Sequence, residues 1–152
     1  MLFRSPATTN LITDLDAGTL LPRAADGSET ILVVEDERDL REIITRTLIR
    51  HGYRVFQAVD GNNAIQIWNE YRNDIDLVFT DVIMPGGING REMAERFLKQ
   101  KPELKVIYST GYSADALGKD FRLDLDLNYL PKPYMPEDLA RIVRRRLDDK
   151  AN

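Results

Sequence analysis

Ile-Asp-Leu-Val-Phe-Thr-Asp, at residues 75–81, is a run of strand-forming residues that ends in a carboxylate. β-Branched and aromatic side chains in a short apolar run are typical of a buried strand. The sequence continues Val-Ile-Met-Pro, and the proline at position 85 marks a loop. We therefore predict a strand over residues 75–80 that carries Asp81 at its tip, where the loop begins.

Three more apolar runs end in polar side chains that are useful for chemistry. Glu35 and Asp36 follow residues 31–34, Thr110 follows residues 106–109, and Lys132 follows residues 129–131. In an open parallel sheet the carboxyl ends of the strands share one edge, and ligands bind there. The sequence thus predicts acids, one hydroxyl and one ammonium gathered around Asp81.

The length of 152 residues suits one compact domain with some extra chain. Residues 1–28 mix Ser, Thr, Asn, Gly, Pro and Asp with scattered leucines, so we predict a flexible N-terminal tail or linker. Regular patterning begins at Ile31. We predict one folded domain over residues 29–150.

The charge and composition exclude several classes of partner. The formal net charge is -4, which gives no basic field for nucleic acid or for an anionic membrane surface. The chain has no cysteine, so it has no disulfides and no thiolate site, and this suits the reducing cytosol. No apolar stretch approaches the roughly 20 residues of a membrane span. We predict a cytoplasmic protein without a nucleic-acid or membrane partner.

Amphipathic segments alternate with the apolar runs. Helices are expected over about residues 37–51, after a cap at Asp60, from Asn89 to about Gln100, and from Pro136 onward. Strands are expected at 31–34, 53–58, 75–80, 104–109 and 127–130, with a short helical pattern at 114–117 inside the weakest stretch. Five strands alternating with five helices predict a doubly wound α/β domain, with a parallel sheet covered on both faces.

Glu35, Asp36 and Asp81 indicate a magnesium site. Three carboxylates within a few ångströms repel one another, and a hard divalent cation among them lowers that cost. Oxygen-only ligands favour magnesium, calcium or manganese over zinc, and a site with few protein ligands suits Mg²⁺ best, with Mn²⁺ as a substitute. A carboxylate beside such a metal is a competent nucleophile toward phosphorus, so Asp81 is the candidate nucleophile.

Lys132 and Thr110 complete a set of groups for phosphoryl transfer. The Lys132 ammonium can pair with Asp81 at rest and with a phosphoryl oxygen after transfer, and Thr110 can donate one further hydrogen bond. Phosphoryl transfer depends mostly on positioning and charge neutralisation. A carboxylate nucleophile needs no general base.

From about Thr30 to Asp149 the chain resembles the receiver domain of two-component response regulators. In that family an acidic pair follows strand one, the phosphoacceptor aspartate follows strand three, Ser or Thr ends strand four, and a lysine before a cis proline ends strand five. All four landmarks occur here in that order, as Glu35-Asp36, Asp81, Thr110 and Lys132-Pro133. The resemblance implies a flavodoxin-like sheet with strand order 2-1-3-4-5.

The resemblance also implies roles for particular residues. Asp36 and Asp81 would ligate the metal together with the backbone carbonyl of Ile83, and Glu35 would act mainly through water. Thr110 and Tyr129 would be the switch residues that move on phosphorylation.

Two features depart from the commonest family pattern. The first acid is Glu35, where the family more often has aspartate, and the loop at residues 84–90 is one residue longer than in the simplest receivers. The longer loop and the segments at 110–113 and 131–134 resemble receivers attached to hybrid histidine kinases. We expect a single-domain regulator or an excised receiver.

The leading hypothesis is a phosphoacceptor switch in a phosphorelay. Asp81 would receive its phosphoryl group from a phosphohistidine of a sensor histidine kinase or phosphotransfer protein, and the output would be binding to a downstream protein. The protein would not be an enzyme beyond its own phosphorylation and dephosphorylation, and its oligomeric state stays open, a homodimer included.

Two alternatives remain from the residues. A magnesium-dependent aspartyl-nucleophile phosphohydrolase would normally carry a second acid two residues after the nucleophile, where this chain has Ile83. The other alternative is a receiver whose protein binding is indifferent to phosphorylation.

Two structural expectations concern charged residues near helix ends. Asp36 is placed to cap the helix that follows it, in addition to any metal role. Four arginines near the C-terminus suit a solvated helix face: Arg141, Arg144, Arg145 and Arg146.

Overall fold

The computed structural model describes residues 27–111, 123–125 and 127–149. Two expectations from the sequence therefore lie outside the described residues. They are the flexible tail, for all but its last two residues, and the short helical pattern at 114–117.

The described chain alternates strands and helices along most of its length. In order, the elements are β1 (Thr30–Val34), α2 (Arg38–Arg50), β2 (Arg54–Ala58), α3 (Gly61–Tyr71), β3 (Leu77–Asp81), α4 (Gly90–Gln100), β4 (Lys105–Thr110), β5 (Tyr129–Pro131) and α5 (Pro136–Asp148). The strands pair in parallel in the order β2-β1-β3-β4-β5. This confirms the predicted doubly wound α/β class and the flavodoxin-like strand order.

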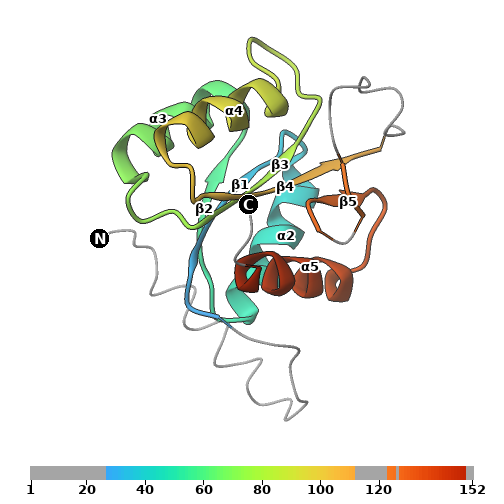
Figure 1. The fold of residues 1–152 in the computed structure, drawn as a ribbon. Coiled ribbons are helices and arrows are strands. Elements are labelled where there is room, and N and C mark those ends of the chain that lie inside the picture. Colours follow the sequence, from blue (N-terminus) through green and yellow to red (C-terminus); the bar gives the residue numbers. More distant parts are fainter. Residues whose placement is uncertain (1–26, 112–122, 126, 150–152) are drawn as a thin grey trace.

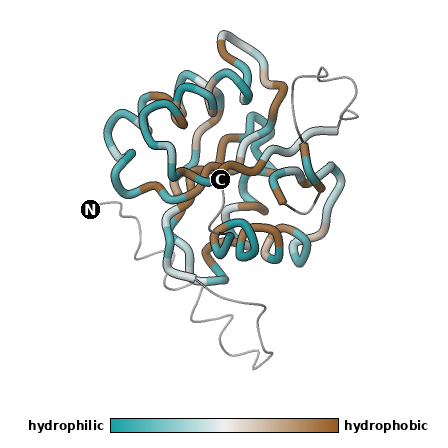
Figure 2. Tube along the Cα trace, viewed as in Figure 1, coloured by the Kyte–Doolittle hydropathy of each residue, from teal (hydrophilic) through white to brown (hydrophobic). Residues whose placement is uncertain are grey.

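Helices cover both faces of the sheet, with α3 and α4 on one side and α2 and α5 on the other (Figure 1). Apolar residues line the central strands and the inward sides of the helices (Figure 2). Alternate residues of β1 and β3 point to opposite faces, so Leu32 and Val78 join one core cluster while Val33 and Phe79 join the other. Both clusters must form for the strand ends to meet at one edge.

Two helices begin at the capping residues that the sequence predicts, Asp60 and Asn89. The Asp60 side chain accepts a hydrogen bond from the Asn63 amide at the start of α3, and Asn89 accepts one from the Glu92 amide at the start of α4. Gly52 follows α2 with φ +95°, a conformation that glycine adopts at low cost.

Trp68 is the largest fully buried side chain and joins α3 to α4. Its ring stacks on Phe97 with centroids 4.2 Å apart, and its indole nitrogen donates to Gln100 Oε1 at 2.7 Å. Stacking and hydrogen bonding thus fix the two helices against each other beside the sheet.

The arginines of α5 are not all on a solvated face, which corrects the expectation from the sequence. Arg144 pairs with both carboxylate oxygens of Glu29, at 3.1 and 2.8 Å, and also with Asp148. Arg146 is buried, and its Nε donates to the Val106 carbonyl at 3.3 Å. Tertiary contacts override the surface pattern, because a long arginine stem can cover apolar surface while its head finds acceptors.

Trp68→Ala should lower the free energy of unfolding by about 3–5 kcal/mol, because it opens a cavity and breaks the stack. Urea denaturation measures this. The control is Ile43→Ala on α2, where the side chain is 53% exposed, and it should change stability by less than about 0.5 kcal/mol. Equal effects of the two substitutions would contradict the described packing.

Glu29→Gln should lower stability at neutral pH by about 1 kcal/mol, because the Arg144 pair is only partly shielded from solvent. The hydrogen bond from Arg144 holds the pKa of Glu29 below its ordinary value of 4.5. A depressed pKa contributes stability above pH 4.5, and this contribution is lost as the pH falls through the lowered value. The difference in the free energy of unfolding between wild type and variant should therefore disappear at acid pH. A gap independent of pH would refute the ion pair.

Candidate functional site

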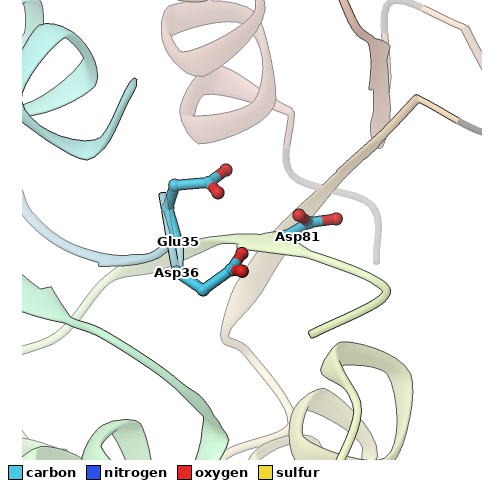
Figure 3. A group of neighbouring side chains, drawn as sticks. All are labelled: Glu35, Asp36 and Asp81. Carbon is cyan, nitrogen blue, oxygen red and sulfur yellow. The ribbon is translucent and has the colours of Figure 1, made fainter. Parts of the chain in front are cut away.

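Three carboxylates meet at the carboxyl edge of the sheet. Glu35 and Asp36 directly follow β1, and Asp81 is the last residue of β3, the neighbouring strand. One oxygen from each carboxylate lies within 4.8 Å of the others. Figure 3 shows Asp36 directed toward Asp81, while Glu35 leaves the chain on the other side. The structure thus brings together the three acids that the sequence singled out.

Asp36 does not cap the following helix, contrary to the expectation from the sequence. The N-cap of α2 is Glu37, and it makes no side-chain cap bond. The Glu37 amide instead donates to Glu35 Oε2 at 3.1 Å. The Asp36 carboxylate lies in the acidic cluster, and the residue stands one position before the N-cap of α2.

Lys132 places one ammonium between two of the acids. Its Nζ lies 3.1 Å from Glu35 Oε1 and 3.1 Å from Asp81 Oδ2. The residue follows β5, and its peptide bond to Pro133 is cis. Among the described residues, three carboxylates and the Lys132 ammonium thus lie together at this site, and the Arg41 guanidinium donates to the Glu35 carbonyl at 2.8 Å.

Burial shifts the ionisation of these groups. Burial raises the pKa of Asp81, and Lys132 and the Ile83 amide oppose this shift. Burial likewise raises the pKa of Glu35, against the amide of Glu37 and the ammonium of Lys132. Burial lowers the pKa of Lys132, but its bonds to the two acids outweigh this and leave that pKa raised. The raised pKa values of all three groups indicate that this partly desolvated site carries more negative than positive charge.

The residues fit a hard divalent cation. With all three acids ionised, Lys132 neutralises one charge and leaves two, which a divalent ion would balance. All the donors are oxygens, which suits magnesium-like ions. The Ile83 amide donates to Asp81 Oδ1 at 3.3 Å, so the backbone of the adjoining loop is held against the same carboxylate.

A close approach at Gly90 closes the loop that follows Asp81, and the sequence analysis did not identify it. A Cβ on Gly90 would collide with the Asp81 carbonyl oxygen, and the Gly90 amide donates to the Val82 carbonyl at 2.8 Å. Glycine lets the first turn of α4 pack directly against the end of β3. The signal in the sequence was a glycine immediately after the Asn89 cap.

Thr110 and Tyr129 lie in the two strands at the β5 side of the sheet. Thr110 is the last residue of β4 and is 1% exposed, and its carbonyl accepts a hydrogen bond from the Lys132 amide at 3.0 Å. Tyr129 begins β5 opposite Tyr108 and is buried. Both residues are therefore packed near the backbone that carries Lys132.

None of the helices in the described part of the chain is both long enough and apolar enough to cross a membrane.

The family model for the response regulator receiver domain matches residues 31–144. The sensor kinase CckA of Brucella abortus (strain 2308) is 35% identical over 122 residues, which are 80% of this chain and 13% of CckA. The response regulator receiver protein CpdR of the same organism is 32% identical over 117 residues, covering 77% of this chain and 95% of CpdR.

Solved structures agree with these relatives. The crystal structure of the receiver domain from the hybrid histidine kinase CckA has a TM-score of 0.65 and 34% identity, covering 78% of this chain and 99% of that one. A response regulator receiver protein from Sinorhizobium medicae WSM419 has a TM-score of 0.72 and 25% identity, covering 82% and 98%. The family model, the relatives and the solved structures agree, and this chain belongs to the response regulator receiver domain family, a non-enzymatic module of two-component signalling.

Proposed function

We propose that Asp81 is the phosphoacceptor of a phosphorelay switch. The observation that carries this is the contact of its carboxylate with both the acidic cluster and the Lys132 ammonium, at the end of the central strand β3. A carboxylate oxygen of Asp81 attacks the phosphorus of a phosphohistidine, the phosphorus–nitrogen bond breaks, and the imidazole leaves. Water later hydrolyses the acyl phosphate and returns the carboxylate.

Magnesium is the proposed cofactor, with manganese as a substitute. Asp36, Asp81 and the Ile83 carbonyl would hold it, and Glu35 would act mainly through water. When bound, the ion supplies charge neutralisation at the phosphoryl oxygens. Lys132 holds the Asp81 carboxylate in place at rest and pairs with a phosphoryl oxygen after transfer.

Thr110 and Tyr129 are the proposed switch residues. A phosphoryl group on Asp81 adds negative charge and acceptor oxygens, and the Thr110 hydroxyl moves inward to donate to one of them. Tyr129 then fills the space that Thr110 leaves. The two packings form a two-state switch that is read on the face formed by β4, β5 and α5.

The proposed donors are a sensor histidine kinase or a histidine phosphotransfer protein, in the cytoplasm. Family membership supports a histidine kinase partner. The proposed output is binding to a downstream protein in the phosphorylated state. The phosphohydrolase alternative is less well supported, because the position two residues after Asp81 is Ile83 rather than a second acid.

Acetyl phosphate with Mg²⁺ should add one phosphoryl group to wild type, because the small donor needs only the nucleophile and the charged site. Intact-protein mass spectrometry measures the addition. Asp81→Asn should abolish it, since an amide is a poor nucleophile. Asp74→Asn, at an exposed acid after α3, is the matched control and should be labelled like wild type. Labelling of Asp81→Asn equal to wild type would reject Asp81 as the phosphoacceptor.

Lys132→Met should raise the pKa values of Asp81 and Glu35 further, because it removes the cation that lowers both. Carboxyl-detected NMR titration without metal measures this. At neutral pH the variant should also lose about 1.5–3 kcal/mol of stability, because two buried acids lose a charged hydrogen-bond partner. That loss should shrink on acidification, when the acids become neutral. Lys99→Met, at an exposed position on α4, is the control. Unchanged pKa values in Lys132→Met would contradict the shared ion pair.

A further inference from the structure

The peptide group that joins Glu35 to Asp36 is held by a side chain from α2. Arg41 Nη1 donates to the Glu35 carbonyl oxygen at 2.8 Å, in a partly buried setting. That oxygen belongs to the same peptide group as the Asp36 amide. Because a peptide group is planar, a contact at its oxygen restrains the rotation that would move Asp36 relative to Glu35.

Backbone contacts hold the chain on either side of this peptide group. The Glu35 amide donates to the Ala58 carbonyl at the end of β2, at 3.1 Å, and the Arg41 amide donates to the Glu37 carbonyl at 2.9 Å. A side-chain cap commonly stabilises the start of a helix, but the N-cap residue Glu37 makes no such bond. At this helix start the Arg41 side chain instead reaches back across the turn to the end of β1.

Asp36 is the acid of the cluster that depends most on its backbone. Glu35 and Asp81 are buried, at 2% and 7% exposed, and each pairs with Lys132. Asp36 is exposed, so packing around its side chain restrains it less. The Glu35 and Asp36 side chains leave the chain on opposite sides (Figure 3). Their shared peptide group therefore sets the direction in which Asp36 presents its carboxylate.

We propose that Arg41 is a positioning residue for the metal site, which holds the peptide group between Glu35 and Asp36 so that the Asp36 carboxylate faces Asp81. This inference rests on the proposed metal role of Asp36 and Asp81. Arg41 acts through the backbone and not as a ligand, because a guanidinium has only donors. Groups behind the ligands of a metal site orient them and thereby tune its affinity.

The sign of the effect separates positioning from charge. An arginine near a cation site repels the ion, so the loss of Arg41 would strengthen metal binding if its charge alone mattered. If Arg41 positions Asp36, its loss weakens metal binding even though the repulsion is also removed. The two roles predict opposite changes in affinity.

The test measures the Mn²⁺ affinity of the full chain from the signal of the unbound ion in electron paramagnetic resonance. Thermal unfolding without metal shows that each variant is folded at the temperature of the titration. Arg41→Met keeps an apolar stem and removes the donors and the charge. It should bind Mn²⁺ about tenfold more weakly, at the low end of the losses caused by removing a group behind metal ligands. Arg41→Lys keeps a charged donor, and its affinity should lie between those of wild type and Arg41→Met.

Arg38→Met is the matched control. Arg38 lies on the same helix, its side chain is 81% exposed, and it pairs with Glu42 at 3.4 Å. The substitution removes the same charge from α2 and leaves the contact with the Glu35 carbonyl in place. This variant should bind Mn²⁺ as tightly as wild type or slightly more tightly.

Phosphorylation gives a second readout. In Arg41→Met the Mg²⁺ concentration that gives half-maximal labelling by acetyl phosphate should rise, and saturating Mg²⁺ should restore most of the rate. A loss of rate that saturating Mg²⁺ leaves unchanged would contradict a role in metal binding.

Two further results would overturn the inference. One is an Mn²⁺ affinity of folded Arg41→Met equal to or higher than that of wild type, which would leave Arg41 as a charge only. The other is an equal loss of affinity in Arg38→Met. If wild type itself fails to bind Mn²⁺, the proposed metal site fails instead, so the two failures are distinguishable.

Discussion

The sharing of one ammonium among buried acids is the interaction on which this site depends. Lys132 lies at 3.1 Å from both Glu35 and Asp81, and Asp36 completes a cluster of three carboxylates whose charge exceeds that of Lys132. The resting site is therefore short of positive charge. In the proposed function, a divalent cation would supply that charge, and a phosphoryl group on Asp81 would offer Lys132 a further acceptor. Charge balance would thus link metal binding, phosphoryl transfer and switching.

The fold holds this charge imbalance in place by packing. Two apolar clusters pack on opposite faces of the sheet. This packing keeps the ends of β1 and β3 together despite the repulsion between their carboxylates. Gly90 lets α4 pack directly on the carbonyl of Asp81. Stability in the two cores offsets the cost of gathering like charges at the edge.

Local signals made much of the fold predictable. Asp60 and Asn89 cap helices and Gly52 ends one, because these residues act through their own neighbours. The acids and Lys132 were found because the ends of parallel strands share an edge. Long-range contacts were not predictable from the sequence. Nothing in the helical pattern of α5 shows that Arg144 pairs with Glu29 or that Arg146 donates to the Val106 carbonyl in β4. Asp36 was wrongly expected to cap α2, because the sequence does not show that the helix begins at Arg38, which makes Glu37 the N-cap residue.

The central claim is that the acidic cluster holds a divalent cation beside Asp81. Crystals grown with Mn²⁺ test it most directly, because anomalous scattering locates this ion independently of the protein model. The account predicts one strong peak between the carboxylates of Asp36 and Asp81, in contact with the Ile83 carbonyl. A saturated crystal with no peak there, or with the ion bound only at other acids, would contradict it.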